Sequence, residues 1–268
     1  MKRHITLLLC ACLMAAGVQA QFVEKEKRVE QPVQERSEGI LRSLTKGLEY
    51  TLRAGFSLGG TSPLPLPAEI RGINSYNPTV CIAIEGDVHK RFGDWGFMFG
   101  LRLETKGMQT DARVKNYHME MVSPDRGEIE GNFTGNVKTK VRNTILSVPL
   151  LATYRVSPRW DLKLGPYLSF VTNRDFSGSV YDGYLREGSP IGQKVEITAE
   201  NPATYDFSSD LRKFQWGAQL GAEWKAFSHF NVYADLTWGL NSIFQSSFDT
   251  ITFEMYPIYA TLGFAYAF

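Results

Sequence analysis

The chain has 268 residues, of which 43% are hydrophobic, 21% charged and 13% aromatic, a composition that excludes a disordered chain, a collagen-like repeat and a small disulfide scaffold. The formal net charge of +1 gives no general electrostatic reason to hold nucleic acid, so no nucleic-acid partner is predicted. No apolar run approaches the roughly 18 residues of a membrane-spanning helix, and none is expected.

The first twenty residues have the pattern of a secretory signal peptide. A basic start, Lys2 and Arg3, precedes an apolar stretch over residues 5–14, and small residues follow up to Ala20. We therefore expect export and cleavage near Ala20. A lipoprotein signal over Leu9–Cys12 is the alternative, but its second position holds a cysteine, which fits that motif poorly.

Residues 21–48 form a charged segment that we expect in the periplasm. Apolar residues from Ile40 to Leu48 recur at helical spacing, which predicts a short helix beginning near Ser37. That helix would either cap the domain that follows or contact a partner, and capping is favoured slightly. After the signal peptide the chain holds one cysteine, Cys81, so no intramolecular disulfide forms and a buried packing role is expected.

Apolar and polar residues alternate through the rest of the chain, which is typical of half-buried strands. This alternation fits a soluble lipocalin-like barrel or an outer-membrane barrel, whose apolar face contacts lipid. One change of phase, at Val137, Thr139 and Val141, predicts a bulge near 143–145. Eight strands are expected, near residues 50–58, 80–88, 95–103, 146–154, 160–170, 214–224, 230–240 and 256–268.

Three features favour the outer-membrane barrel. Long connections alternate with short ones, as extracellular loops alternate with periplasmic turns. The last strand ends in an aromatic residue, which indicates recognition by the barrel-assembly machinery. Aromatic residues also stand at strand ends, where they predict girdles that contact outer-membrane lipid. The predicted girdle residues are Trp95, Trp160, Trp216, Trp224, Trp238, Tyr266 and Phe268.

Five short segments, taken in order, carry a family resemblance. They resemble PorT-like outer-membrane barrels of the Bacteroidota, over roughly residues 49–268. The resemblance implies an eight-stranded antiparallel transmembrane β-barrel in the bacterial outer membrane, with long extracellular loops and short periplasmic turns. It also permits a role in a secretion or envelope assembly, and it implies no single activity. The segments are Gly100–Gly107, Val148–Tyr154, Gly165–Ser169, Asp235–Asn241 and Leu262–Phe268.

The inward face of this barrel carries charges of both signs in nearly equal number. Eight strands leave an interior just wide enough for side chains, and buried charges are tolerated when they are paired. The sequence therefore predicts an ion-paired plug in preference to a pore. Its predicted members are Arg53, Glu85, Asp87, Arg102, Glu104, Lys106, Arg155, Asp161, Lys163, Glu223 and Asp235.

The loops are the predicted functional surface. The third long loop is acidic and aromatic, which suits a cation, a sugar or a protein, although a plain solvated loop has the same composition. The candidate residues are Asp175, Tyr181, Asp182, Tyr184, Glu187 and Tyr205.

No nucleophile motif, metal-ligand spacing or phosphate-binding loop occurs in the sequence. We therefore predict no catalytic residue, no metal site and no cofactor; His118, two residues from Glu120, is the one candidate that an enzyme would use. The predicted function is a non-enzymatic structural or binding role exerted through the loops. A component of a secretion or envelope assembly, with an envelope protein as partner, is the alternative, followed by a small pore and an outer-membrane enzyme.

Overall fold

The computed structural model describes residues 46–189 and 191–268. The predicted signal peptide and its cleavage site, and all but the last residues of the predicted periplasmic segment, lie outside the described residues. Residues 47–268 form one compact unit. In the part of the chain described, no helix has the length and apolar character needed to cross a bilayer.

The described residues form twelve strands and one short 3-10 helix, so the predicted number of eight strands is wrong. All strands belong to one antiparallel sheet. The elements are β1 (Leu48–Pro63), β2 (Ile70–Pro78), β3 (Cys81–Phe92), β4 (Trp95–Ser123), β5 (Gly127–Ser157), β6 (Trp160–Asn173), β7 (Phe176–Glu187), β8 (Lys194–Ile197), β9 (Ala203–Asp206), η1 (Ser208–Asp210), β10 (Phe214–Lys225), β11 (Phe230–Gly239) and β12 (Met255–Ala267).

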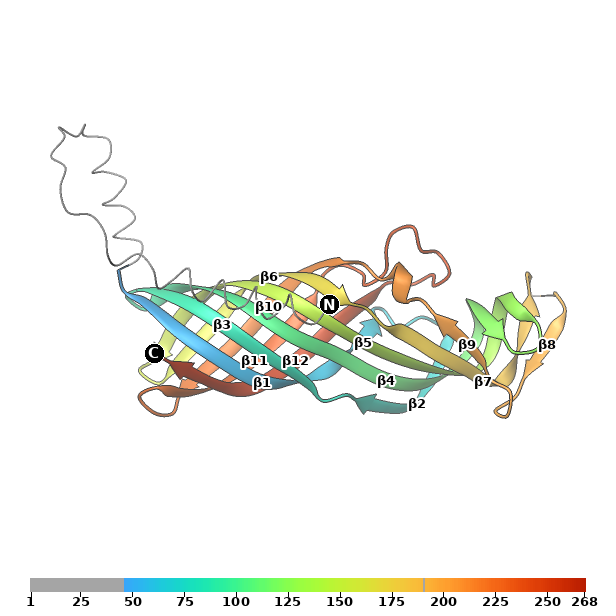
Figure 1. Cartoon of the computed structure of the whole chain (residues 1–268), viewed down its shortest axis with the longest axis horizontal. Coiled ribbons are helices and arrows are strands. Elements are labelled where there is room, and N and C mark those ends of the chain that lie inside the picture. The colour runs from blue at the N-terminus through green and yellow to red at the C-terminus, as the bar shows by residue number, and fades with distance from the viewer. Residues whose placement is uncertain (1–45, 190) are drawn as a thin grey trace, which may run out of the picture. The chain divides into compact units, whose positions relative to one another are not determined.

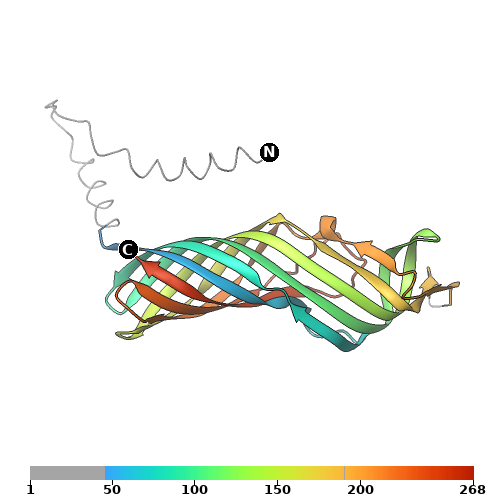
Figure 2. The ribbon, with the colours of Figure 1, turned by 60° about the horizontal axis from the view of Figure 1, so that its bottom comes forward.

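Eight of these strands, the ones that alternation predicts, pair in a ring. The pairing runs β1–β3–β4–β5–β6–β10–β11–β12 and returns from β12 to β1. Figures 1 and 2 show these strands side by side and tilted along the unit. Short turns join them at the end that holds the C-terminus; Gly93, with φ of +67°, supplies the left-handed residue of the turn between β3 and β4.

The outer face of the ring is apolar and exposed. Leucine, isoleucine, valine and aromatic side chains alternate there with inward residues along every ring strand, because successive side chains of a strand point to opposite faces. All seven predicted girdle residues are exposed: six lie on this face, and Phe268 follows the end of β12. Trp160 stacks on Trp224 from the neighbouring strand, with ring centres 6.4 Å apart, and Trp95 lies 4.7 Å from Tyr154.

Two ring strands continue far beyond the others. β4 has 29 residues and β5 has 31, and their far halves pair with each other, with β2 and with β7. β9 pairs with both β4 and β7, and β8 with β7. We call residues 108–141 together with β7, β8 and β9 the distal module. Much of the second and third predicted loops is therefore strand (Figure 1).

The bulge predicted at 143–145 does not reverse the alternation of β5. Odd-numbered residues face inward from Val137 through Ile145 to Thr153, and their pairing with β4 keeps one register across this stretch. A register shift between Thr144 and Ile145 affects only the pairing with β6. What changes is the chemistry of the interior, which is polar inside the ring and apolar in the distal module.

Two smaller predictions concern single residues. Cys81 is buried, as expected, and its thiol donates to the backbone oxygen of Thr79 at 3.2 Å. Pro149 faces inward on β5 opposite Tyr167. The alternation of β4 does reverse once, at a bulge between Val114 and Tyr117 where Asn116 takes φ of +56°.

Candidate functional site

The ring encloses a charged network that we call the polar core. Sequence alternation assigns its members to the inward face, and the structure places them there. Ten of the eleven are buried, and Arg155 is partly exposed near the short turns. Each takes part in an ion pair. The members are Arg53, Glu85, Asp87, Arg102, Glu104, Lys106, Arg155, Asp161, Lys163, Glu223 and Asp235.

Arg53 on β1 contacts carboxylates from three other strands. Its Nε lies 2.7 Å from Asp87 Oδ2, its Nη1 lies 3.7 Å from Asp235 Oδ2, and its Nη2 pairs with Glu223. The guanidinium also lies 5.0 Å from the centre of the Tyr233 ring. Because Arg53 is only 2% exposed, these contacts replace the water that a free charge requires.

Arg102 and Lys163 connect the remaining carboxylates at this level. Arg102 pairs with Glu85, and its Nη2 lies 3.5 Å from Asp235 Oδ2. Lys163 Nζ lies 3.2 Å from Glu223 and 3.4 Å from Asp235. Opposite charges therefore alternate within contact distance across the ring, whereas an ion-selective pore carries an excess of one sign.

Lys106 marks the layer of the polar core nearest the distal module. Its Nζ lies 3.2 Å from Glu104, which also accepts a hydrogen bond from Ser147 at 3.0 Å. The same ammonium lies 5.4 Å from the Tyr167 ring centre and 5.3 Å from that of Tyr259. The interior therefore changes from charged to apolar at the level of these two tyrosine rings.

Asp161 holds the other end of the polar core, near the short turns. Its carboxylate lies 2.6 Å from Arg91, 3.0 Å from Lys225 and 3.9 Å from Arg155. Arg91 is absent from the predicted set. Its signal was present in the sequence, because it continues the inward series of residues 85–91 at two-residue spacing.

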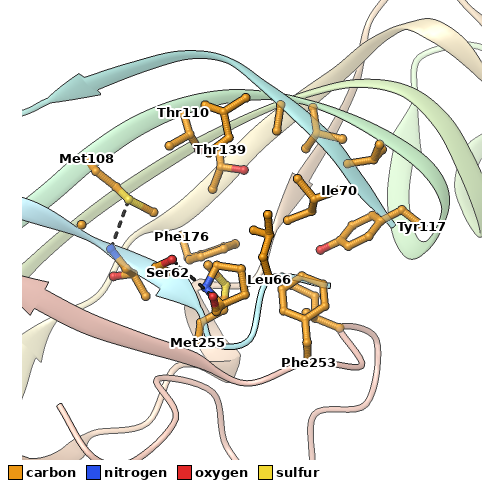
Figure 3. Close-up of a pocket in the computed structure, with 18 of the residues that line it drawn as sticks. Ser62, Leu66, Ile70, Met108, Thr110, Tyr117, Thr139, Phe176, Phe253 and Met255 are labelled. Atoms are coloured by element: carbon orange, nitrogen blue, oxygen red, sulfur yellow. Dashed lines mark hydrogen bonds between the residues drawn. The ribbon is translucent and has the colours of Figure 1, made fainter. Parts of the chain in front are cut away.

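An apolar cavity of about 310 Å³ lies on the other side of the polar core, at the base of the distal module. β1, β2, β4, β5, β7 and the segment before β12 all contribute to its lining, which includes Met108, Val137, Phe176, Ile251 and Met255. Figure 3 shows the lining side chains converging on one space. The sequence analysis does not predict this cavity. The apolar run on the inward face of β5 indicates it, but the same run also suggests the bulge predicted near 143–145.

Tyr117 supplies a polar group to this apolar space. Figure 3 shows its hydroxyl directed into the cavity, and its ring centre lies 5.8 Å from that of Phe253. Within the described residues the hydroxyl has no hydrogen-bond partner, and burial raises the pKa of Tyr117. The group therefore stays protonated and is free to donate a hydrogen bond to a molecule in the cavity.

The predicted loop surface is only partly a surface. Asp182 and Glu187 are exposed, and Asp175, Tyr181 and Tyr184 are half-buried. Tyr205 does not lie on the surface: it is buried in the distal module and lines the cavity, where its hydroxyl lies 2.7 Å from Thr139 Oγ1 and its ring 5.2 Å from that of Phe207. Binding by the exposed members stays a prediction.

Tyr181 donates a hydrogen bond to Asp111 at 2.5 Å, which raises the pKa of Tyr181 to about 12. A raised tyrosine pKa means that folding favours the protonated form, so this contact stabilises the fold below about pH 10 and is lost as the pH rises towards 12. In an Asp111→Asn variant we expect Tyr181 to titrate near its ordinary value of about 10.

An NMR titration of ¹³C-labelled tyrosine checks this expectation. Tyr181→Phe identifies the resonance of Tyr181 by its loss, and Tyr184→Phe serves as the matched control. An unchanged Tyr181 pKa in Asp111→Asn would contradict the assignment of the shift to this hydrogen bond.

His118 lies on the distal part of β4, apart from the polar core and the cavity lining. Its Nε2 is 3.2 Å from Glu130 Oε1, and both side chains reach solvent. Glu120, which lies two residues from His118 in the sequence, is opposite Glu130 in the register of β4 and β5. The geometry therefore gives His118 a surface hydrogen bond with Glu130.

Comparisons with known proteins bear on the fold. A sequence model of the family described as "Outer membrane protein beta-barrel domain" matches residues 19–245. No curated protein matches the chain. Among solved structures, the chain is similar to Ail, the attachment invasion locus protein of Yersinia pestis, in complex with the heparin analogue sucrose octasulfate. Identity is 13%, the TM-score is 0.38, and 83% of this chain and 99% of that chain are covered.

Two further solved structures are similar at the same level. The outer membrane protease OmpT of Escherichia coli shares 12% identity at a TM-score of 0.37, with 83% of this chain and 97% of that chain covered. Neisserial surface protein A shares 10% identity at a TM-score of 0.31, with 83% and 98% covered. Likenesses this distant carry no argument about activity or ligand.

Proposed function

This chain belongs to the outer membrane protein beta-barrel domain family, and from that premise we propose that it is a closed, ligand-binding barrel of the bacterial outer membrane. In this proposal the eight-stranded ring spans the membrane, its apolar outer face contacts lipid, and the distal module is extracellular. The polar core keeps the ring closed. The apolar cavity directly beyond the polar core, which carries the proposal, binds an apolar molecule with one polar group.

The size and lining of the cavity support this role. Small-molecule sites typically have about 300–1,000 Å³, are lined mainly by apolar side chains and contain a few placed polar groups. The cavity has about 310 Å³, its lining is mostly apolar, and Tyr117 offers a donor. An apolar lining favours apolar molecules, because water finds few hydrogen-bond partners along it.

Binding of a fluorescent fatty acid, cis-parinaric acid, to the purified protein in detergent tests the proposal. Ala112 lines the cavity, so Ala112→Phe fills part of it and is expected to weaken binding by at least about tenfold, or about 1.4 kcal/mol. The matched control is Ala199→Phe, at an exposed position away from the cavity, which is expected to bind like the natural protein. Equal affinity in all three proteins would contradict the proposed site.

Tyr117→Phe tests the polar group separately. It removes only the hydroxyl, so we expect a loss of about 0.5–1.5 kcal/mol of binding free energy, the net value of one hydrogen bond. The same titration with an apolar probe that lacks a carboxyl group is expected to show no difference between Tyr117→Phe and the natural protein. A difference there would assign the loss to packing instead.

The other candidate functions have less support. An envelope-assembly component, as the PorT-like resemblance permits, would depend on residues 21–48, which lie almost entirely outside the described residues. A pore conflicts with the paired charges of the polar core, and we propose no catalysed reaction. The finer resemblance to PorT-like barrels of the Bacteroidota stays a prediction, as does assembly through the strand ending at Phe268.

A further inference from the structure

Two neighbouring strands of the ring, β1 and β3, stop pairing beside the cavity. β1 pairs with β3 from Leu48 up to Ser57, opposite Cys81. Beyond that point residues 58–63 of β1 continue with β12 alone, and residues 70–78 of β2 pair with β4 alone. We call this division between 58–63 and 70–78 the fork.

The cavity reaches the surface at the fork. Of its lining residues, three are exposed: Leu66 at 58%, Ile73 at 61% and Tyr76 at 46%. All three belong to β2 or to the connection that leads into it, and all three are apolar or aromatic. The lining also includes Ile258, an outward-facing residue of β12, so the cavity extends from the interior to the outer face of the sheet.

The fork lies level with Trp238, one of the predicted girdle residues. Gly60 on β1 is opposite Ile258 on β12, which is opposite Trp238 on β11. At the base of the fork, Leu58 and Val80 are exposed on the outer face that we assign to lipid. The opening is therefore continuous with the upper edge of the lipid-facing surface.

The edges of the fork offer polar backbone groups. The Thr61 N–H donates to Met108 Sδ at 3.2 Å, a weak acceptor, and the Gly59 carbonyl accepts a bond of 2.6 Å from the Tyr76 hydroxyl across the fork. Backbone that lacks sheet partners at membrane depth is tolerated only where it lines a cavity or meets another polar group. An ester or carboxyl group placed here would be a better acceptor for Thr61.

From these observations the geometry points to lateral loading: an acyl chain of an outer-leaflet lipid enters the cavity sideways through the fork. This inference rests on the proposed binding function and names its ligand class and its route. The apolar chain fills the cavity, and the carbonyl at its head meets the edges of the fork. The polar core stops the chain from passing further into the ring.

Photo-crosslinking in liposomes tests the route. The probe is a phosphatidylcholine that carries a diazirine at the end of one acyl chain, and mass spectrometry locates the labelled peptides. We expect labels on peptides with the buried cavity residues Met108 and Phe176, besides labels on the lipid-facing peptides of the ring. Absence of cavity labels with this probe, while the lipid-facing peptides are labelled, would overturn lateral loading.

Gly60→Leu closes the fork. A side chain at Gly60 would begin 2.7 Å from Met108 Sδ and 3.5 Å from Tyr76, so leucine fills the opening. Cavity labelling is expected to fall by about tenfold, equal to about 1.4 kcal/mol. The matched control is Gly72→Leu on β2, where an added side chain meets nothing within 4 Å and labelling should not change. Unaltered labelling of lipid-facing peptides verifies that each variant is folded and inserted.

Two further experiments separate failure of the lateral route from failure of cavity binding. Tyr76→Phe removes the hydroxyl that bridges the fork, and cavity labelling is expected to rise. A diazirine-bearing free fatty acid, added to the protein in detergent, reports on the cavity without requiring the membrane route. Cavity labels from this acid but none from the phospholipid would refute the route alone, whereas none from either probe would also refute the proposed function.

Discussion

Replacing Arg53 by leucine is expected to lower the free energy of unfolding by about 3–5 kcal/mol, because one partner of a buried ion pair is then left without compensation. Glu223 and Asp235 keep Lys163 as a partner after the change. Asp87 does not: within the described residues its only ion pair is with Arg53. Equilibrium unfolding in urea, followed by tryptophan fluorescence in detergent, measures the loss.

The control for Arg53→Leu is the same exchange at an exposed arginine. Arg126 lies at the tip between β4 and β5, and Arg126→Leu is expected to change stability by no more than about 0.5 kcal/mol. Adding Asp87→Asn to Arg53→Leu removes the stranded charge, so the double variant should recover much of the loss. Equal stability of Arg53→Leu and Arg126→Leu would contradict the role of Arg53 in the polar core.

Replacing Phe133 by alanine is expected to destabilise the distal module by about 3–5 kcal/mol while the ring stays intact. Phe133 is fully buried, and its ring lies against the backbones of Gly135 and Gly183, where an added Cβ would come within 2.6 Å and 2.8 Å of it. Its loss therefore leaves a hole that these strands cannot easily fill. Because the distal module builds the cavity, binding of cis-parinaric acid should weaken in parallel.

Hydrogen exchange of backbone amides separates the two parts of the chain. In Phe133→Ala, protection should fall in β7, β8 and β9 and persist in β10, β11 and β12. Phe133→Leu, which keeps most of the volume, should cost less than about 1.5 kcal/mol and serves as the graded control. Uniform loss of protection across both sets of strands would show that the ring and the distal module do not differ in local stability.

The eight ring strands could be predicted because each has one apolar and one polar face, and two-residue alternation survives any tilt or register. The four additional strands could not. β2, β7, β8 and β9 cover the far halves of β4 and β5, where Phe133, Val137 and Val141 make the inward face of β5 apolar. If the whole interior is assumed to be polar, these apolar residues indicate a shift of register in β5. In the structure, β5 keeps its register and passes from the polar ring into an apolar core.

The candidate site divides in the same way. Membership of the polar core follows from charge and parity, so all eleven residues could be named from the sequence. Their partners could not, because pairs such as Arg53 and Glu223 lie 170 positions apart and depend on the register of the whole ring. The fork depends on where β1 leaves β3, a tertiary event without a local signal. Tyr205 belongs to a strand of only four residues, β9, which is too short for its alternation to stand out within an acidic, aromatic loop.

Conductance of the natural protein in planar bilayers measures whether the membrane ring is closed beneath the proposed ligand-binding cavity. We expect insertion without steady ion current at neutral pH, because paired charges fill the ring from Asp161 to Lys106. The apolar cavity beyond them adds no path for ions. Steady, resolvable single-channel current from the inserted natural protein would contradict the account and would make the protein a pore.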